Sequence, residues 1–207
     1  MSEIRPKIVL ASASPRRREL LTEAGYEFVV VLPDESAECG LRPGESASAG
    51  VARLARQKAA DVATRGVEGW VVGCDTVVEC RGQILGKPED RDQARQMLEQ
   101  LRGQEHVVYS GLCLWRVPGG QPCVRVAITR LVMAAISDQQ LADYLDSGQW
   151  RGKAGAFGYQ DGHDWLQIQE GSESNVVGLP LELLAEMLRD AQRHGNEAEF
   201  EAGLRRG

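Results

Sequence analysis

Twelve residues near the start of the chain, Leu10 to Leu21, constrain the fold more than any other segment. The apolar stretch 7–10 predicts a short strand, and the residues after it predict an immediate turn into a helix. Ser14 suits the N-cap, and Pro15 suits the first helical position, where its missing N–H would be unpaired anyway. Leucines at helical spacing follow, and Gly25 can end the helix. The segment therefore joins a strand exit directly to a helix start.

Arg16 and Arg17 fall in the first turn of this predicted helix, which is the unfavourable end for cations. The helix dipole is positive there, and each misplaced charge costs roughly a few tenths of a kcal/mol. A bound anion would reverse the sign of that cost, because free backbone N–H groups, nearby serines and both guanidinium groups would point toward it. A phosphate site and a solvated basic face are equally consistent with this segment taken alone.

The composition argues against several function classes. The chain has 207 residues, 43% of them hydrophobic, which is enough for one large domain or two small lobes with a real core. A net charge of −6 disfavours general nucleic-acid binding. Five cysteines without a C-x-x-C pair predict reduced thiols and a cytoplasmic location. No apolar stretch approaches the ~18 residues of a membrane span, so we do not expect a membrane partner. Because of the net charge, we do not expect a nucleic acid as partner either.

Strands and helices are predicted to alternate along the chain. The helices are expected over 46–64, 90–101, about 137–146, and from Pro180 onward. The strands are expected over 28–32, 70–73, 76–80, 83–85, 106–117, 123–136 and 165–169. Residues 33–44 and 149–164 are expected to be loops, and the two longest strands to form a hairpin. The pattern predicts an α/β or α+β domain around a mixed sheet, with a single domain over 1–195 and a polar tail over 196–207.

Two charged residues interrupt otherwise apolar patterns. Asp75 lies within the apolar run 71–78, where a carboxylate is costly unless it is paired, metal-bound or functional. The alternative is an aspartate in a turn or bulge between two strands, which Gly73 would permit. Lys58 falls on the core-facing stripe of the helix predicted over 46–64. It either extends outward along its own stem or reaches an internal anionic site.

Two further segments are candidates for ligand contact. Lys87 lies between Gly86 and Pro88, which fix the backbone and aim its side chain, although a solvated turn lysine is the commoner case. The glycine-rich stretch 152–160 would let backbone approach a ligand closely, but it lacks the order of a Walker loop. Its last residue, Gln160, offers the donors and acceptor that a base reader needs, or is a plain surface glutamine. The three histidines show no ligand spacing and are expected to be exposed or structural: His106, His163 and His194.

Taken together, these segments resemble the Maf family of nucleotide pyrophosphatases. The matching segments are S-A-S-P-R-R-R-E-L-L (12–21), R-L-A-R-Q-K-A (53–59), G-C-D-T-V-V (73–78), G-K-P (86–88), L-R-G-Q-E-H-V-V (101–108), G-K-A-G-A-F-G-Y-Q (152–160) and N-V-V-G-L-P-L (175–181). They follow the order of the family from residue 8 to about residue 190. The first segment and the glycine-rich segment are the most specific.

The resemblance implies an elongated α/β domain, with a curved mixed sheet, flanking helices and two lobes around a central cleft, similar to the inosine-triphosphatase-like fold. The implied reaction is hydrolysis of a nucleoside triphosphate between the α and β phosphorus atoms, which gives a monophosphate and pyrophosphate. A divalent metal ion is implied as cofactor, magnesium first and manganese as the alternative. The resemblance also implies a homodimer.

The same resemblance implies roles for individual residues. Asp75 matches the proposed general base and could equally be a metal ligand, with Lys58 and Lys87 as catalytic cations. An acidic residue after the second strand also belongs to the family site, and both Glu35 and Glu38 are candidates for it as metal ligands. The substrate-binding residues implied by the matching segments are Ser12, Arg16, Arg17, Thr76, Lys153 and Gln160.

Thr76 and Gln160 place the chain with family members that resemble dTTP/UTP pyrophosphatases. The alternatives are a pyrophosphatase for 7-methyl-GTP or another modified nucleotide, and a regulatory protein acting in cell division. Two residues depart from the common pattern: Asp161 replaces a glycine, and Cys74 replaces an alanine.

Overall fold

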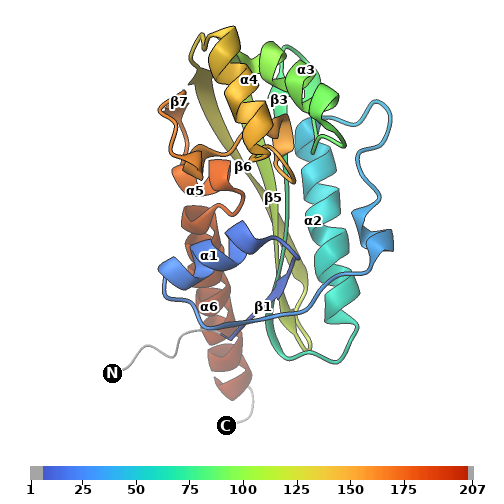
Figure 1. The fold of residues 1–207 in the computed structure, drawn as a ribbon. Coiled ribbons are helices and arrows are strands. Elements are labelled where there is room, and N and C mark those ends of the chain that lie inside the picture. Colours follow the sequence, from blue (N-terminus) through green and yellow to red (C-terminus); the bar gives the residue numbers. More distant parts are fainter. Residues whose placement is uncertain (1–6, 205–207) are drawn as a thin grey trace.

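A seven-stranded mixed sheet forms the frame of the molecule (Figure 1). The computed structural model describes residues 7–204, with side chains through residue 193. The strand order is β2-β1-β3-β5-β6-β7, and β4 pairs with β3. β1 runs parallel to β2 and β3, whereas β3, β5, β6 and β7 pair antiparallel. The expected mixed sheet, with the β5–β6 hairpin within it and helices around it, is confirmed.

Strands and helices alternate along most of the chain. The strands are β1 (Ile8–Ala11), β2 (Phe28–Val30), β3 (Gly69–Cys80), β4 (Gln83–Leu85), β5 (Glu105–Val117), β6 (Pro122–Met133) and β7 (Leu166–Glu170). The α-helices are α1 (Pro15–Glu23), α2 (Ala47–Ala63), α3 (Arg91–Leu101), α4 (Asp138–Ser147), α5 (Glu173–Val177) and α6 (Leu181–Leu204). The short 3-10 helices are η1 (Glu35–Glu38), η2 (Ala154–Ala156) and η3 (Tyr159–Asp161).

Helix caps explain why several helices begin where the sequence predicts. The side chains of Ser46, Asp90 and Ser137 each accept a hydrogen bond from a backbone N–H in the first turn of α2, α3 and α4. Ser14 occupies the N-cap of α1 but makes no side-chain cap, and its own N–H donates to Ser12 Oγ at 3.2 Å. Ser14 therefore stands at the start of α1 without stabilising it through a side-chain hydrogen bond.

The structure corrects four predictions of local structure. Residues 70–73 and 76–80 belong to one continuous strand, β3, so Asp75 lies in mid-strand and not at a junction. The loops predicted over 33–44 and 149–164 contain η1, η2 and η3, and the short helix α5 was not predicted. α6 runs to Leu204, so most of the segment expected as a tail is helical, and residues 205–207 lie outside the described residues. No helix in the described part of the chain is long and apolar enough to cross a membrane.

Two glycines let α2 lie unusually close to the sheet. A Cβ atom at Gly73 on β3 would come within 2.2 Å of the Ala55 carbonyl oxygen, and one at Gly111 on β5 within 2.1 Å of the Val51 carbonyl oxygen. Any side chain at either position would therefore collide with helix backbone, which cannot move aside cheaply. This close approach sets the position of the side chains that α2 directs along the sheet, Lys58 among them.

Two main hydrophobic cores lie at opposite ends of the sheet. One is built by α3, α4 and the adjoining ends of β5 and β6 around Leu98, Leu131 and Leu145. The other is built by α1, α6 and β1 around Leu10, Leu21 and Leu184. α3 and α4 lie at the top of Figure 1, and α1 and α6 lie below them. The two lobes share the long central strands.

Candidate active site

A gap in one edge of the sheet positions the site. β5 pairs with β3 along nearly its whole length, so β1 and β4 share the other edge of β3. β1 pairs with residues 70–73 and β4 with residues 78–80. Residues 74–77 between them have no strand partner on that edge in the part of the chain that the structure describes. The chain leaves β1 at Ser12 and β4 at Gly86, and both exits open into this gap.

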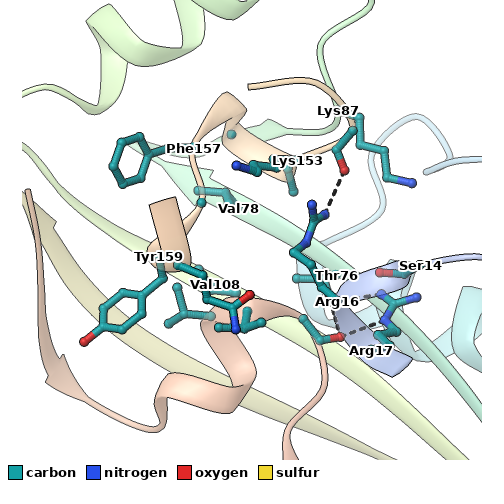
Figure 2. Close-up of a pocket in the computed structure, with 18 of the residues that line it drawn as sticks. Ser14, Arg16, Arg17, Thr76, Val78, Lys87, Val108, Lys153, Phe157 and Tyr159 are labelled. Atoms are coloured by element: carbon teal, nitrogen blue, oxygen red, sulfur yellow. Dashed lines mark hydrogen bonds between the residues drawn. The ribbon is translucent and has the colours of Figure 1, made fainter. Parts of the chain in front are cut away.

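A cavity of about 530 Å³ lies at the gap, between the two cores. Successive side chains of a strand point to opposite faces, and the missing partner strand lets both Asp75 and Thr76 reach the cavity from their two faces. Every residue predicted for the site lines this cavity except Glu35. In Figure 2, Arg16, Arg17 and Lys87 lie on one side of the cavity, and Val78, Val108 and Phe157 lie on the other. The cavity thus has a charged polar end and an apolar end.

Lys58 is the centre of a charged cluster at the polar end. Its Nζ lies 2.7 Å from Asp75 Oδ1 and 3.3 Å from Glu38 Oε1. The Lys58 side chain is only 7% exposed and that of Asp75 only 16%. Of the two possibilities for Lys58, the internal anionic site is the one that the structure shows. The cluster joins η1, α2 and β3, three successive elements of the chain.

The charges in this cluster change the pKa values of its neighbours. Partial burial opposes ionisation of Glu38, but Lys58 outweighs it, with help from Lys87 and Arg17, so the pKa of Glu38 is lowered. Lys87 sits exposed at the mouth of the cavity, and partial desolvation, followed by the charge of Lys58, lowers its pKa. Lys87 makes no hydrogen bond or ion pair within the described residues. Its ammonium group is therefore available to an anionic ligand.

Arg17 is engaged by the protein itself. Its Nε donates to the Gly178 carbonyl oxygen at 2.7 Å, one terminal nitrogen to Ser12 Oγ at 3.0 Å, and the other to Thr76 Oγ1 at 3.3 Å. Thr76 Oγ1 also lies 2.8 Å from Ser110 Oγ. Figure 2 shows the Arg17 fork pointing into these partners. Arg17 and Thr76 thus line the cavity as predicted, while their polar atoms connect the exit of β1, the middle of β3 and the end of α5.

Polar contacts hold the glycine-rich loop against the cavity. Arg16 donates to the Gly152 carbonyl oxygen at 2.9 Å, which joins α1 to the loop across the cavity (Figure 2). Lys153 forms an ion pair with Asp161, and Asp161 also accepts from the Tyr144 hydroxyl and from the Gly158 N–H. Asp161, one of the two departures from the family pattern, therefore holds Lys153 and the loop backbone in place.

The family is decided by comparison with known proteins. The sequence profile of the family described as Maf-like protein matches residues 7–191. The chain belongs to the Maf-like family. A protein of Rhodopirellula baltica named dTTP/UTP pyrophosphatase is 53% identical over 191 residues, which are 92% of this chain and 84% of that protein. A protein of Geotalea uraniireducens with the same name is 41% identical over 190 residues, which are 91% of this chain and 97% of that protein. Among solved structures, the Staphylococcus aureus Ham1 protein aligns with a TM-score of 0.41 at 13% identity, over 62% of this chain and 72% of that one.

The carboxylates of this Maf protein fit a shared metal ion better than a protein-only metal cage. The described residues contain no group of three or more histidine, cysteine or acidic side chains that could hold a metal. Asp75 and Glu38 both face the cavity and are close enough to share Lys58 Nζ. Magnesium commonly takes one or two carboxylates and completes its shell with water and substrate phosphates. Glu35 is exposed and lies outside the cavity lining, so the structure brings only Glu38 of the two candidates into this Maf site.

Three residues of the Maf site were not predicted as site residues from the sequence. Ser110 and Gly178 contact Thr76 and Arg17, but a buried serine and a glycine carbonyl carry no local signal of that role. His106 was expected to be an ordinary exposed or structural histidine. It is only 5% exposed, and its side chain lines the apolar end of the cavity. The alternation of β5 was the available signal, since it places His106, Val108 and Ser110 on one face.

Proposed function

We propose that this Maf protein hydrolyses dTTP and UTP to the nucleoside monophosphate and pyrophosphate. The observation that carries the proposal is the half-buried carboxylate of Asp75, held at 2.7 Å by Lys58 within a cavity whose mouth is lined by further cations. The printed names of the relatives, at up to 53% identity over most of the chain, support the same activity.

The polar end supplies the charge that a triphosphate needs. Arg16, Lys58 and Lys87 come from α1, α2 and the turn after β4, and all three line the cavity. The first turn of α1 adds backbone N–H groups at a positive helix end. Such fixed cations and dipoles stabilise the charge that develops on phosphate oxygens in the transition state, and they also align the substrate. Lys153, held by Asp161, and Ser12, held by Arg17, are proposed to contact the phosphates from either side.

Asp75 is proposed to act at the α-phosphorus. The oxygen of a water molecule attacks this phosphorus, the bond to the bridging oxygen of the β-phosphate breaks, and the water proton passes to Asp75. Lys58 donates to Asp75 Oδ1 and holds the carboxylate oriented for this transfer. A divalent metal ion, magnesium or manganese, would be held by Asp75 and Glu38 and would supply further neutralisation of the phosphates.

Gln160 is proposed to contribute to the choice of base. It is exposed, lines the cavity and belongs to the loop that faces the apolar end. Uracil and thymine present an N–H donor between two carbonyl acceptors, and a glutamine amide offers both a donor and an acceptor to such an edge. Gln160→Glu should weaken the preference for dTTP and UTP, because it removes the side-chain donors and adds a charge. The control is Gln149→Glu, an exposed position outside the cavity lining.

A pyrophosphate-release assay across dTTP, UTP, CTP, ATP, GTP and 7-methyl-GTP tests the proposal. We expect kcat/KM for dTTP and UTP to exceed the values for ATP and GTP by at least ~10-fold, the scale set by leaving a buried polar group unpaired. Equal values for UTP and 7-methyl-GTP would contradict the pyrimidine preference. No pyrophosphate from any nucleotide would contradict the enzymatic function and favour a regulatory role.

We also propose that the protein acts in the cytoplasm as a homodimer. All five cysteines are free in the structure, which fits a reducing compartment. Light scattering coupled to size-exclusion chromatography, at several protein concentrations, measures the mass directly. A mass of one chain at all concentrations would contradict the dimer.

A further inference from the structure

The apolar end of the cavity is a chamber with a buried histidine in its wall. Here the cavity is walled by side chains from β3, β5 and β6 and from the loop before β7, among them Val78, Val108, Leu131 and Phe157. His106 of β5 lies among them, pairs with Leu131 across the sheet, and is 5% exposed. A buried hydrogen-bonding group in a mostly apolar wall is typical of a site that orients a flat, mostly apolar ligand.

The hydrogen bond of His106 determines what its ring can offer to a ligand. Nδ1 lies 3.3 Å from the Gln104 carbonyl oxygen. A carbonyl can only accept, so Nδ1 must carry the proton for this bond to form. Burial lowers the pKa of His106, which keeps the ring neutral at physiological pH. In that tautomer Nε2 is an acceptor, and the structure gives Nε2 no partner within the described residues.

The cavity has the right length to bring a base to this acceptor. Ser110, beside Thr76 at the polar end, and His106 lie four residues apart on β5, or about 13 Å at the rise of a strand. This separation is comparable with the length of a nucleoside monophosphate. A triphosphate whose α-phosphorus lies near Asp75 therefore extends its base toward the chamber.

We propose that His106 determines base specificity by accepting a hydrogen bond from N3–H of uracil or thymine. The inference rests on the proposed function and adds the residue that separates these two bases from cytosine. Cytosine carries an acceptor at N3, so it would face the acceptor of His106 with no proton between them. Gln160 lies at the exposed side of the same cavity, where its amide can donate to a base carbonyl.

The first test needs no mutation. The unmodified protein is assayed for pyrophosphate release from UTP, CTP and N3-methyluridine triphosphate, which keeps both carbonyls of uracil and carries a methyl group in place of the N3 donor. We expect kcat/KM for CTP and for the N3-methyl analogue to be at least ~10-fold below that for UTP, with most of the change in KM. If the N3-methyl analogue is hydrolysed as well as UTP, the inference is overturned and the pyrophosphatase proposal stands.

The second test uses two substitutions at the same position. His106→Phe keeps a flat ring and removes the acceptor, so the ratio of kcat/KM between UTP and CTP should fall toward one. His106→Gln can present a carbonyl oxygen where Nε2 lies, so it should retain part of the ratio. His163→Gln, in the loop and outside the cavity lining, should keep the full ratio. Circular dichroism and the melting temperature show which variants are folded, and a folded His106→Phe protein with the unmodified ratio would overturn the inference.

The two proposals fail in different ways. If the unmodified protein releases pyrophosphate from no pyrimidine triphosphate, the proposed function fails and the role of His106 fails with it. If it hydrolyses UTP and CTP equally, the function survives in a broader form, and the role of His106 is overturned.

Discussion

The clusters around Lys58 and Arg17 lie on opposite faces of β3, a few residues apart, and they use their cations differently. Lys58 contacts two carboxylates, Asp75 and Glu38. Arg17 contacts only neutral oxygens: the Gly178 carbonyl, Ser12 Oγ and Thr76 Oγ1. The positive charge of Lys58 is therefore balanced by the negative charges of its two partners. Arg17 keeps its full positive charge while its position is fixed on three sides.

This difference indicates that the two cations have different roles. An ammonium between two carboxylates holds those carboxylates in place, so Lys58 acts through Asp75 and Glu38. A guanidinium held by neutral acceptors adds positive potential to the cavity and joins separate chain segments, because its planar fork can satisfy several acceptors at once. The Lys58 cluster is thus expected to govern the chemical step, and the Arg17 cluster to govern the shape and stability of the site.

The largest effect is expected for Asp75→Asn. This change keeps the shape of the side chain and removes its ability to take a proton, so kcat for UTP should fall by at least ~10²-fold. Circular dichroism should show an unchanged fold. Near-normal kcat in the purified Asp75→Asn protein would contradict the assignment of the chemical step to the Lys58 cluster.

Arg17→Lys tests the other side of the comparison. A lysine cannot reach all three acceptors in the geometry of a guanidinium, so buried oxygens lose their donors, and the free energy of unfolding should drop by about 1–3 kcal/mol. Urea denaturation measures the loss. Arg18→Lys, at the next position but exposed, is the matched control and should change stability by less than about 0.5 kcal/mol. Equal stability of both variants would contradict the joining role of Arg17.

Glu38→Gln and Glu35→Gln sharpen the assignment of the second carboxylate. Both residues lie in η1, but only Glu38 lines the cavity and contacts Lys58. We expect Glu38→Gln to raise several-fold the magnesium concentration that gives half-maximal activity, while Glu35→Gln leaves it unchanged. The opposite ranking would place Glu38 outside the metal-binding set and count against the carboxylate pair.

The smallest effect expected is a pH dependence of stability from Glu38. Its pKa in the folded protein lies below the ordinary value of about 4.3, so its charged form stabilises the fold. That contribution is fully present above the ordinary pKa and is lost as pH falls through the lower, folded pKa. The difference in unfolding free energy between the unmodified protein and Glu38→Gln should therefore shrink below about pH 4. A difference that grows toward acid pH would contradict the lowered pKa.

Local patterns in the sequence predicted much of the frame and several site residues. The caps at Ser46, Asp90 and Ser137 use neighbours within three residues, so they can be predicted without a fold. The helical spacing of Lys58 and the apolar run around Asp75 marked both as anomalous, and the structure brings the two together.

Other features could not be predicted because they depend on contacts across the fold. The choice between Glu35 and Glu38 depends on how η1 packs against α2, which no local pattern contains. The hydrogen bond from Arg17 to the Gly178 carbonyl oxygen joins residues that are 161 positions apart in sequence. The helix α5 has only five residues, too few for helical periodicity to emerge. The sequence predicted two strands around Asp75, because a charge in mid-strand resembles a strand end. The missing strand partner at 74–77 and the ion pair with Lys58 explain why a charge is tolerated there.

The central strands that the lobes share also determine the length of the cavity between them. β3 has 12 residues and β5 has 13, and both pass without interruption from one core to the other. Their unbroken pairing connects the charged end of the cavity with the apolar end. A ligand therefore has to match the length of the cavity as well as the chemistry of its two ends. The connection over 148–162 lies against this cavity and is held to the rest of the molecule by Arg16, by Tyr144 and by the Gly155 N–H, which donates to the Gly86 carbonyl oxygen.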